Sequence, residues 1–141
     1  MSHCKFSCDN VAVDILSDGS GVILRHDVVY YDRSGCPHIA WKGMFSDGRS
    51  GPVAGKPPIR SRYFRAWLIH DALIEKGKLV GGPEGVVIRK FADKLLAFDA
   101  LKTLRMPLWR RLRVYAGVSI GTLIGEPRVL SRTFWRPQAG N

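Results

Sequence analysis

The sequence of 141 residues lacks several features that would place it in a specialised class of proteins. It has only three cysteines, which excludes the dense disulfide framework of small secreted domains. No stretch reaches the roughly 20 apolar residues that a membrane-spanning helix needs. The first ten residues also lack the apolar run of a secretory signal, so we expect the chain to fold in a cytoplasm.

Acidic residues are scarce, and the imbalance is uneven along the chain. The net charge is +10, with 22 Lys and Arg against 12 Asp and Glu. Residues 1–40 carry three basic and five acidic side chains, whereas residues 41–141 carry nineteen and seven. This positive field favours an acidic partner, either a protein neighbour, an anionic envelope polymer or a nucleic acid. Nucleic acid is not favoured, because the sequence has no zinc-finger spacing or glycine-aromatic sheet signature and no evident helix-turn-helix.

The composition, 45% hydrophobic and 24% charged, is typical of a single globular domain over residues 1–141. Its first part, residues 1–45, is rich in β-branched and aromatic residues. Two such runs, 11–16 and 21–31, flank a Ser-Asp-Gly-Ser turn and predict a β hairpin. A further strand is predicted near residues 38–45.

The second part of the chain has helical periodicity. A loop rich in Gly and Pro over residues 46–60 precedes the helical part, 61–125, and a basic, aromatic tail covers 126–141. The spacing predicts three helices: from an N-cap at Ser61 to a stop at Gly77, over about Ile88–Leu104, and from Pro107 onward. The predicted core stripe of the second helix is Ile88, Phe91, Ala92, Leu95 and Phe98. The chain is therefore predicted to be α+β, with an N-terminal antiparallel hairpin or small sheet followed by a three-helix C-terminal half.

The most informative feature that is present is the pair His70 and Asp71 in the first predicted helix. Asp71 falls on the apolar stripe with Trp67, and His70 borders the same face, so both are predicted to point inward. The side chains predicted on the solvent face are Arg62, Arg65, Glu75 and Lys76. Polar groups in a core need a partner, which here is a metal ion, another segment of the chain or a substrate.

Two kinds of site fit this pair. In a structural clamp, Asp71 accepts backbone hydrogen bonds from the loop at residues 47–50, and His70 donates to a carbonyl group. In a metal-dependent hydrolase, the catalytic residues are His70, Asp71 and Asp47, and the metal ligands are Asp47, His70, Asp71 and Asp93. The ion would be zinc or manganese, and the substrate a phosphoester or a cell-wall peptide. Asp93 has a simpler interpretation as a solvated ion pair with Arg89, Lys90 or Lys94.

Two further groups of residues are candidates for binding. Thiolates and imidazoles are preferred zinc ligands, so His3, Cys4, Cys8, Cys36 and His38 could form a zinc knot, although reduced thiols are the simpler interpretation. A basic surface is predicted at the start of the third helix and in the tail, from Arg110, Arg111, Arg113, Arg128, Arg132, Trp135 and Arg136.

Four motifs occur in a recognisable order: Phe45-Ser46-Asp47-Gly48-Arg49-Ser50 with nearby prolines, Ala66-Trp67-Leu68-Ile69-His70-Asp71, Ala92-Asp93, and Met106-Pro107-Leu108-Trp109-Arg110-Arg111. Over about residues 30–125 this order resembles an uncharacterised family of tailed bacteriophages and prophages known as domain of unknown function 1353. That family usually has threonine where this chain has Ser46. The resemblance points to Asp47, Ser50, His70, Asp71 and Asp93.

The resemblance implies a protein made in the host cytoplasm and located in the virion, in its tail. We expect a structural or assembly component whose basic surface docks on an acidic phage protein, with His70 and Asp71 acting as the clamp. The alternative, which rests on the chemistry of Asp47, His70, Asp71 and Asp93, is the metal-dependent hydrolase, acting in host entry or lysis. A third interpretation is an inhibitor of a host defence protein.

Overall fold

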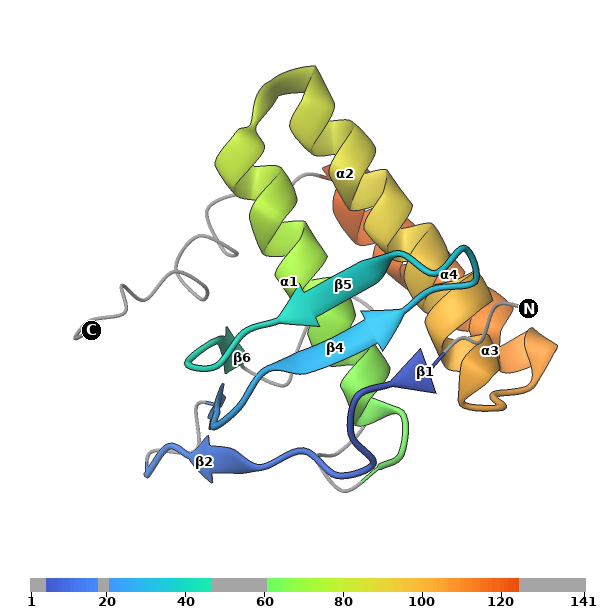
Figure 1. Ribbon diagram of the computed structural model, residues 1–141. Coiled ribbons are helices and arrows are strands. Elements are labelled where there is room, and N and C mark those ends of the chain that lie inside the picture. The colour runs from blue at the N-terminus through green and yellow to red at the C-terminus, as the bar shows by residue number, and fades with distance from the viewer. Residues whose placement is uncertain (1–4, 18–20, 47–60, 125–141) are drawn as a thin grey trace.

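The computed structural model describes residues 5–17, 21–46 and 61–124 (Figure 1). Antiparallel strands in the N-terminal part form two small sheets, and the C-terminal part is helical. The predicted α+β arrangement is therefore confirmed. Apart from Ser46, the predicted loop over 46–60 lies outside the described residues, as does the predicted tail over 126–141.

In the described part of the chain, six short strands form two sheets, and the paired strands are antiparallel. The first sheet has the order β1-β4-β5, from Lys5–Phe6, Val28–Tyr31 and Pro37–Ala40. The second sheet has the order β2-β3-β6, from Val13–Ile15, Val22–Leu24 and Phe45–Ser46. The first sheet packs on α1 through β4 and β5, and Figure 1 shows these strands crossing in front of that helix.

The predicted hairpin is confirmed in part. Strands β2 and β3 pair as expected. The strand predicted over residues 21–31 instead divides into β3 and β4, and β4 belongs to the first sheet. At the break, the Nε2 atom of His26 accepts a hydrogen bond of 3.0 Å from the Ala12 N–H, which replaces a bond between strands. The strand predicted over 38–45 also divides, into β5 and β6. Gly43 lies between them with φ of 90°, a conformation that favours glycine.

The helical half has three parts, as predicted. The first is α1 (Phe64–Val80). The second is a continuous helix that consists of α2 (Gly82–Leu95), the π-helical turn η1 (Leu96–Ala100) and α3 (Leu101–Thr103). The third is α4 (Leu108–Ile124). Figure 1 shows α1 and α2 as an antiparallel pair, with α4 behind α2. Helix α4 follows Pro107 as predicted. No helix within the described ranges is long and apolar enough to cross a lipid bilayer.

The predicted boundaries of the first two helices were wrong. Ser61 forms a turn before α1 instead of capping it, since its Oγ atom accepts a hydrogen bond from the Tyr63 N–H at 3.1 Å. Helix α1 continues through Gly77, which is buried against Gly85 of α2. A Cβ atom on Gly85 would lie 2.2 Å from the Gly77 carbonyl oxygen, so these glycines allow the helices to approach closely. The second helix begins at Gly82, with Pro83 in its first turn, where proline is tolerated.

The core lies between the first sheet, α1 and the second helix, and the predicted inward face of α1 is confirmed. Among its largest fully buried side chains are Tyr30, Leu24, Phe64, Trp67, Leu68, Leu96 and Leu101. The predicted stripe of the second helix is confirmed for Ala92 and Leu95, but Phe91 is 43% exposed. The ring of Phe91 instead contacts the His38 ring of β5, with centroids 5.7 Å apart.

Helix α1 has a narrower solvent face than its periodicity predicts, because the sheet and α2 both pack on it. Glu75 was predicted on the solvent face but is only 3% exposed, and burial raises the pKa of its carboxyl group. The guanidinium of Arg65 lies 4.9 Å from the centroid of the Phe6 ring and donates a 2.6 Å hydrogen bond to the Cys8 carbonyl. Both side chains, predicted to be solvated, therefore contribute to packing.

Candidate functional site

His70 is at the centre of a buried polar network, as the sequence predicts. Helix α1 carries it on its inward face, where it is 5% exposed and lies edge-on to Trp67, with ring centroids 5.7 Å apart. Its Nε2 atom lies 2.8 Å from Oδ1 of Asp93, and its Nδ1 atom lies 3.8 Å from Oδ1 of Asp71. The imidazole is thus placed between two carboxylates, one from its own helix and one from α2.

Asp93 corrects one expectation from the sequence. It was interpreted as a solvated ion pair with neighbouring lysines and arginines, but it is 2% exposed. Besides the contact of its Oδ1 atom with His70, its Oδ2 atom accepts a hydrogen bond of 2.6 Å from the Thr122 hydroxyl. Because Thr122 lies on α4, the Asp93 carboxylate connects all three helical parts. Thr122 could not be predicted as a partner of Asp93, because it is 29 residues away and no local pattern links the two.

Asp71 connects α1 to the second sheet. It is 3% exposed, and its Oδ2 atom accepts a hydrogen bond of 3.0 Å from the Ser46 hydroxyl on β6. Asp71 thus contacts the chain before α1 through the Ser46 side chain, whereas the backbone donors predicted at residues 47–50 lie outside the described residues. The prediction that His70 donates to a carbonyl group was wrong, because its two ring nitrogens face the carboxylates of Asp93 and Asp71. Asp47 and Ser50, which were predicted to belong to the same site, lie outside the described residues.

The charge of His70 follows from these contacts. Burial by itself would lower its pKa, but the contacts with Asp71 and Asp93 outweigh burial and raise the pKa above the ordinary value of 6.5. The protonated ring can therefore be held as a cation between two anions. Among the described residues, the buried Nδ1 atom has no hydrogen-bond partner, which fits an electrostatic contact with Asp71 rather than a directed hydrogen bond.

The described carboxylates of this network do not gather around one point. Asp71 and Asp93 contact opposite nitrogens of the imidazole ring. Among residues 5–17, 21–46 and 61–124, one group of three potential metal ligands has its donor atoms within 4.8 Å of one another, and it is Asp32, Cys36 and His38. Of the predicted metal ligands, His70 thus contacts Asp71 and also contacts Asp93, but the three side chains do not converge on one point.

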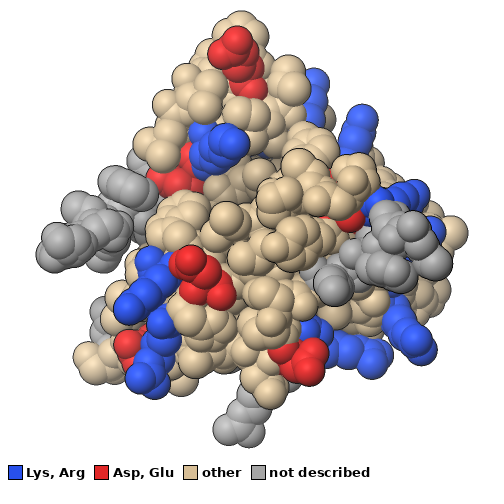
Figure 2. Space-filling model, in the orientation of Figure 1, with Lys and Arg blue, Asp and Glu red and all other residues tan. Residues whose placement is uncertain are grey.

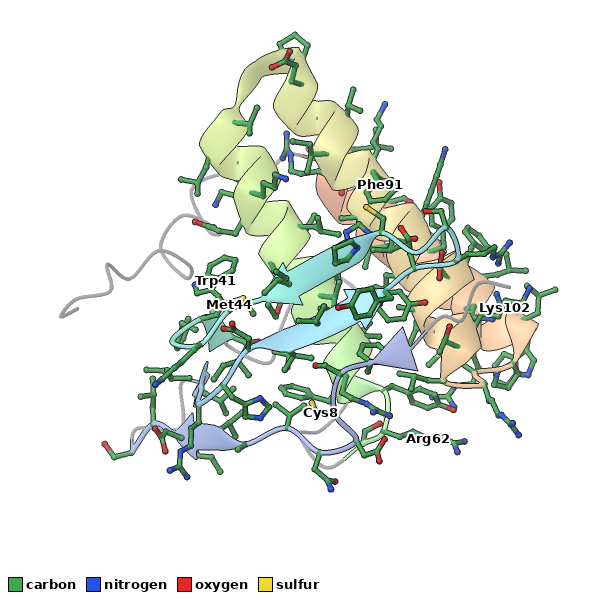
Figure 3. All side chains as sticks on the ribbon, in the orientation of Figure 1. Cys8, Trp41, Met44, Arg62, Phe91 and Lys102 are labelled. Carbon is green, nitrogen blue, oxygen red and sulfur yellow. The ribbon has the colours of Figure 1, made fainter. Side chains whose placement is uncertain are left out.

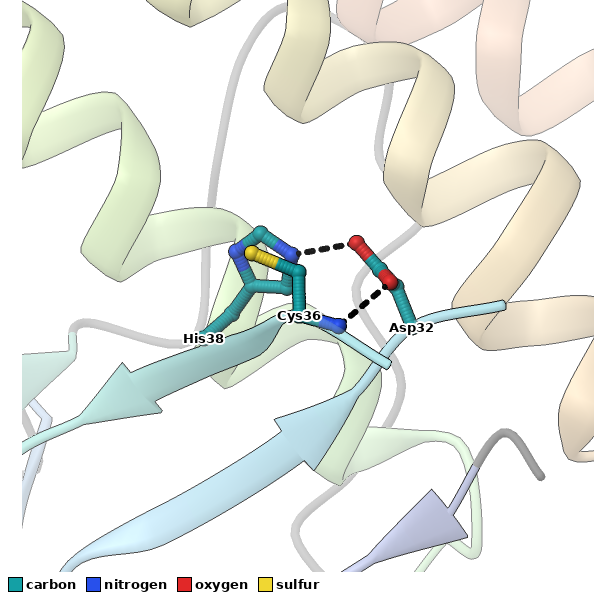
Figure 4. Close-up of side chains that lie close together, drawn as sticks. All are labelled: Asp32, Cys36 and His38. Carbon is teal, nitrogen blue, oxygen red and sulfur yellow. Dashed lines mark hydrogen bonds and ion pairs between the residues drawn. The ribbon is translucent and has the colours of Figure 1, made fainter. Parts of the chain in front are cut away.

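The cluster of Asp32, Cys36 and His38 lies at the turn between β4 and β5 (Figure 4). Two of the predicted zinc-knot residues, Cys36 and His38, are therefore close together. Cys8 is not part of the cluster, and Figure 3 places it near the start of α1, far from this turn. His3 and Cys4 lie outside the described residues. The sequence analysis missed Asp32, although its spacing across a Gly-containing turn could have indicated it.

The predicted basic surface is partly described. On α4, Arg110 and Arg113 are exposed. Arg111 instead donates hydrogen bonds to the Met106 and Ala97 carbonyl groups, at 3.0 and 3.3 Å, and so supports the turn before α4. The other predicted binding residues, Arg128, Arg132, Trp135 and Arg136, lie outside the described residues.

No protein-family model, curated protein or solved structure matches the chain. The resemblance to the bacteriophage family of unknown function therefore stays a prediction.

Proposed function

We propose that the protein is a structural component of a tailed-phage particle that docks on an acidic neighbouring protein through the outer side of α4. The observation that carries this proposal is a surface we call the α4 docking face. It consists of the exposed residues in the first two turns of the helix: Leu108, Trp109, Arg110, Leu112 and Arg113.

The α4 docking face combines apolar area with positive charge. Trp109 is 60% exposed, Leu108 56% and Leu112 48%. Large apolar side chains that lie together on a surface mark interaction sites, and Trp and Arg contribute most to the affinity of interfaces. Two arginines within the same turns add the charge that would orient an acidic partner.

The surroundings of this face extend the positive field. Residues 100–125 contain five Lys and Arg and no Asp or Glu. Lys102 and Arg105 precede α4 and are exposed. Figure 2 shows blue side chains along the right-hand edge, where Figure 1 places α3 and the start of α4. The charged residues of this stretch are therefore all basic, and they would attract an acidic protein surface.

The buried network supports a structural role for His70 and its partners. His70, Asp71 and Asp93 are 5%, 3% and 2% exposed. His70 contacts both carboxylates, Asp71 accepts a hydrogen bond from Ser46, and Asp93 accepts one from Thr122. A network whose members come from β6, α1, α2 and α4 fixes how these elements are arranged. It would hold α4 in place for docking.

The test is whether the chain is incorporated into particles. We expect mass spectrometry of purified particles, made by a phage that encodes this chain, to detect it in stoichiometric amount. The double variant Trp109→Ala and Arg113→Glu should reduce incorporation at least tenfold. A matched control changes Val87→Ala and Lys90→Glu, which are exposed on α2, and should be incorporated normally. Particles that lack the wild-type chain, or that incorporate the two variants equally, would contradict the proposal.

A separate measurement tests the hydrolase alternative. If His70, Asp71 and Asp93 form a clamp, Asp71→Asn should lower the melting temperature and leave the metal content of the purified protein unchanged. A stoichiometric loss of zinc or manganese in Asp71→Asn, with the fold intact by circular dichroism, would instead favour the metal-dependent hydrolase.

A further inference from the structure

The turn between β4 and β5 places three different metal-binding groups side by side. These are the carboxylate of Asp32, the thiol of Cys36 and the imidazole of His38, with donor atoms all within 4.8 Å of one another. Figure 4 shows the three side chains on the same side of the hairpin, in front of the second helix. They come from a stretch of seven residues, and Asp32 pairs directly with His38.

The Asp32 carboxylate is held in a fixed orientation. Its Oδ1 atom accepts hydrogen bonds from the Ser34 N–H at 2.8 Å, the Ser34 hydroxyl at 2.7 Å and the Cys36 N–H at 2.9 Å. Gly35 allows this tight turn with φ of 88°. The Oδ2 atom is therefore directed at His38, whose Nε2 atom lies 2.8 Å away.

The surroundings of the cluster suit an ion that keeps a solvent ligand. The side chains of Asp32 and His38 are each 10% exposed, so the two are largely shielded from solvent. The Phe91 ring packs against the imidazole and limits its movement. Cys36 is exposed, so the cluster opens to solvent on the side of the thiol.

We propose that Asp32, Cys36 and His38 form a zinc-binding site in which water is the fourth ligand. A thiolate and an imidazole favour zinc over magnesium or calcium, which prefer oxygen ligands alone. Three protein ligands and one water are the usual set of an open zinc site. The site differs from the zinc knot predicted from the sequence, because Asp32 takes the place of the more distant cysteines and His3.

The geometry requires only small movements. A tetrahedral zinc ion, with bonds of about 2.0–2.3 Å, separates its ligand atoms by about 3.3–3.7 Å. The 2.8 Å contact between Asp32 and His38 would lengthen by about half an ångström, and the thiol would move inward. On binding, the Cys36 thiol releases its proton to solvent, and the neutral His38 ring carries its proton on Nδ1. Coordinate bonds form from zinc to the Asp32, Cys36 and His38 side chains, the ion releases all but one of its bound waters to solvent, and the hydrogen bond between Asp32 and His38 is lost.

The experiment titrates the reduced, metal-free, full-length protein with Co²⁺, a spectroscopic substitute for zinc. We expect one Co²⁺ per chain, with a thiolate-to-cobalt charge-transfer band and the visible bands of tetrahedral cobalt, and displacement by one equivalent of Zn²⁺. Cys36→Ser should abolish the charge-transfer band and weaken binding at least 100-fold. Because Cys36 is exposed, this variant should fold normally, which circular dichroism checks.

Matched variants keep the test decisive. Cys8→Ser and Cys4→Ser should bind Co²⁺ like the wild type. His38→Gln should weaken binding at least tenfold, and Asp32→Asn should do so if its circular dichroism matches that of the wild type. Absence of stoichiometric binding by the wild type, persistence of the band in Cys36→Ser, or its loss in Cys8→Ser or Cys4→Ser would overturn the proposal. The result is independent of whether the α4 docking face binds a phage protein.

Discussion

The phenol of Tyr30 on β4 donates a hydrogen bond of 2.5 Å to the Asp99 carboxylate in the π-helical turn η1. The Thr103 hydroxyl lies 3.0 Å from the same phenol oxygen. Tyr30 is fully buried at the centre of the first sheet. The wider turn of η1 thus presents a carboxylate to the sheet, and this contact joins the two halves of the molecule.

Tyr30→Phe should therefore destabilise the protein while preserving its packing. Removing the hydroxyl takes the donor from Oδ1 of the half-buried Asp99, whose Oδ2 atom still accepts a hydrogen bond of 3.3 Å from the Arg33 N–H. Losing a hydrogen bond to a charged group costs about 1.5–3 kcal/mol. Urea denaturation measures the change in the free energy of unfolding. Tyr31→Phe is the matched control, because Tyr31 is 39% exposed and surface changes usually stay within about 0.5 kcal/mol. Equal effects of the two variants would contradict this account.

Asp93→Ala should be among the most destabilising single substitutions in the helical half. It leaves His70 without its closest anion and Thr122 without an acceptor, and breaking a buried ion pair costs about 3–5 kcal/mol. Lys94→Ala, at the exposed neighbouring position, provides the comparison. If chemical denaturation gives similar unfolding free energies for both variants, the network does not contribute to stability as described.

The raised pKa of His70 predicts a specific pH dependence. A group with a higher pKa in the folded state contributes its full stability below the unfolded pKa, near 6.5, and loses it as the pH rises through the folded value. The stability advantage of the wild type over His70→Gln should therefore shrink as the pH increases above about 6.5. Denaturation of both proteins at several pH values between 6 and 9 measures this difference. An advantage that grows with pH would mean that the buried imidazole is neutral.

Gly85→Ala should destabilise the protein even though alanine is the better helix former. In an exposed helix the change would stabilise by about 1 kcal/mol. Here the new methyl group would meet the Gly77 carbonyl oxygen at 2.2 Å, and overpacking costs about 1–3 kcal/mol. Thermal unfolding should thus show a lower melting temperature, and Val87→Ala, at a position that is 66% exposed, should show little change. A higher melting temperature for Gly85→Ala would indicate that the helices separate easily.

The sequence was a good guide where a pattern is local. The periodicity around Trp67 correctly placed His70 and Asp71 inside, and Pro107 marked the start of α4. It failed where burial depends on elements distant in sequence. Asp93 has three basic neighbours in sequence and looked solvated, yet α1 and α4 cover it. Glu75 was misplaced because periodicity assumes one buried face, whereas α1 packs on more than one side.

Turn chemistry was harder to predict than helix faces. The residues of the hairpin were predicted, but the places where the predicted strands break were not. At one break the His26 side chain accepts a hydrogen bond from the Ala12 N–H, a contact between residues 14 apart that no local pattern indicates. Asp32 was not predicted as a site residue. Its proximity to His38 follows from the pairing of β4 with β5, which brings residues on either side of the turn together.

The two hydrogen bonds that Arg111 donates bear on how α4 could bind a partner. They tie the second turn of this helix to the Met106 and Ala97 carbonyl groups, on the chain that leads into it. Trp109 and Leu112 are therefore displayed from a main chain that is already fixed. Less conformational entropy is lost on association with such a preorganised surface, so tight binding could be reached with a modest contact area.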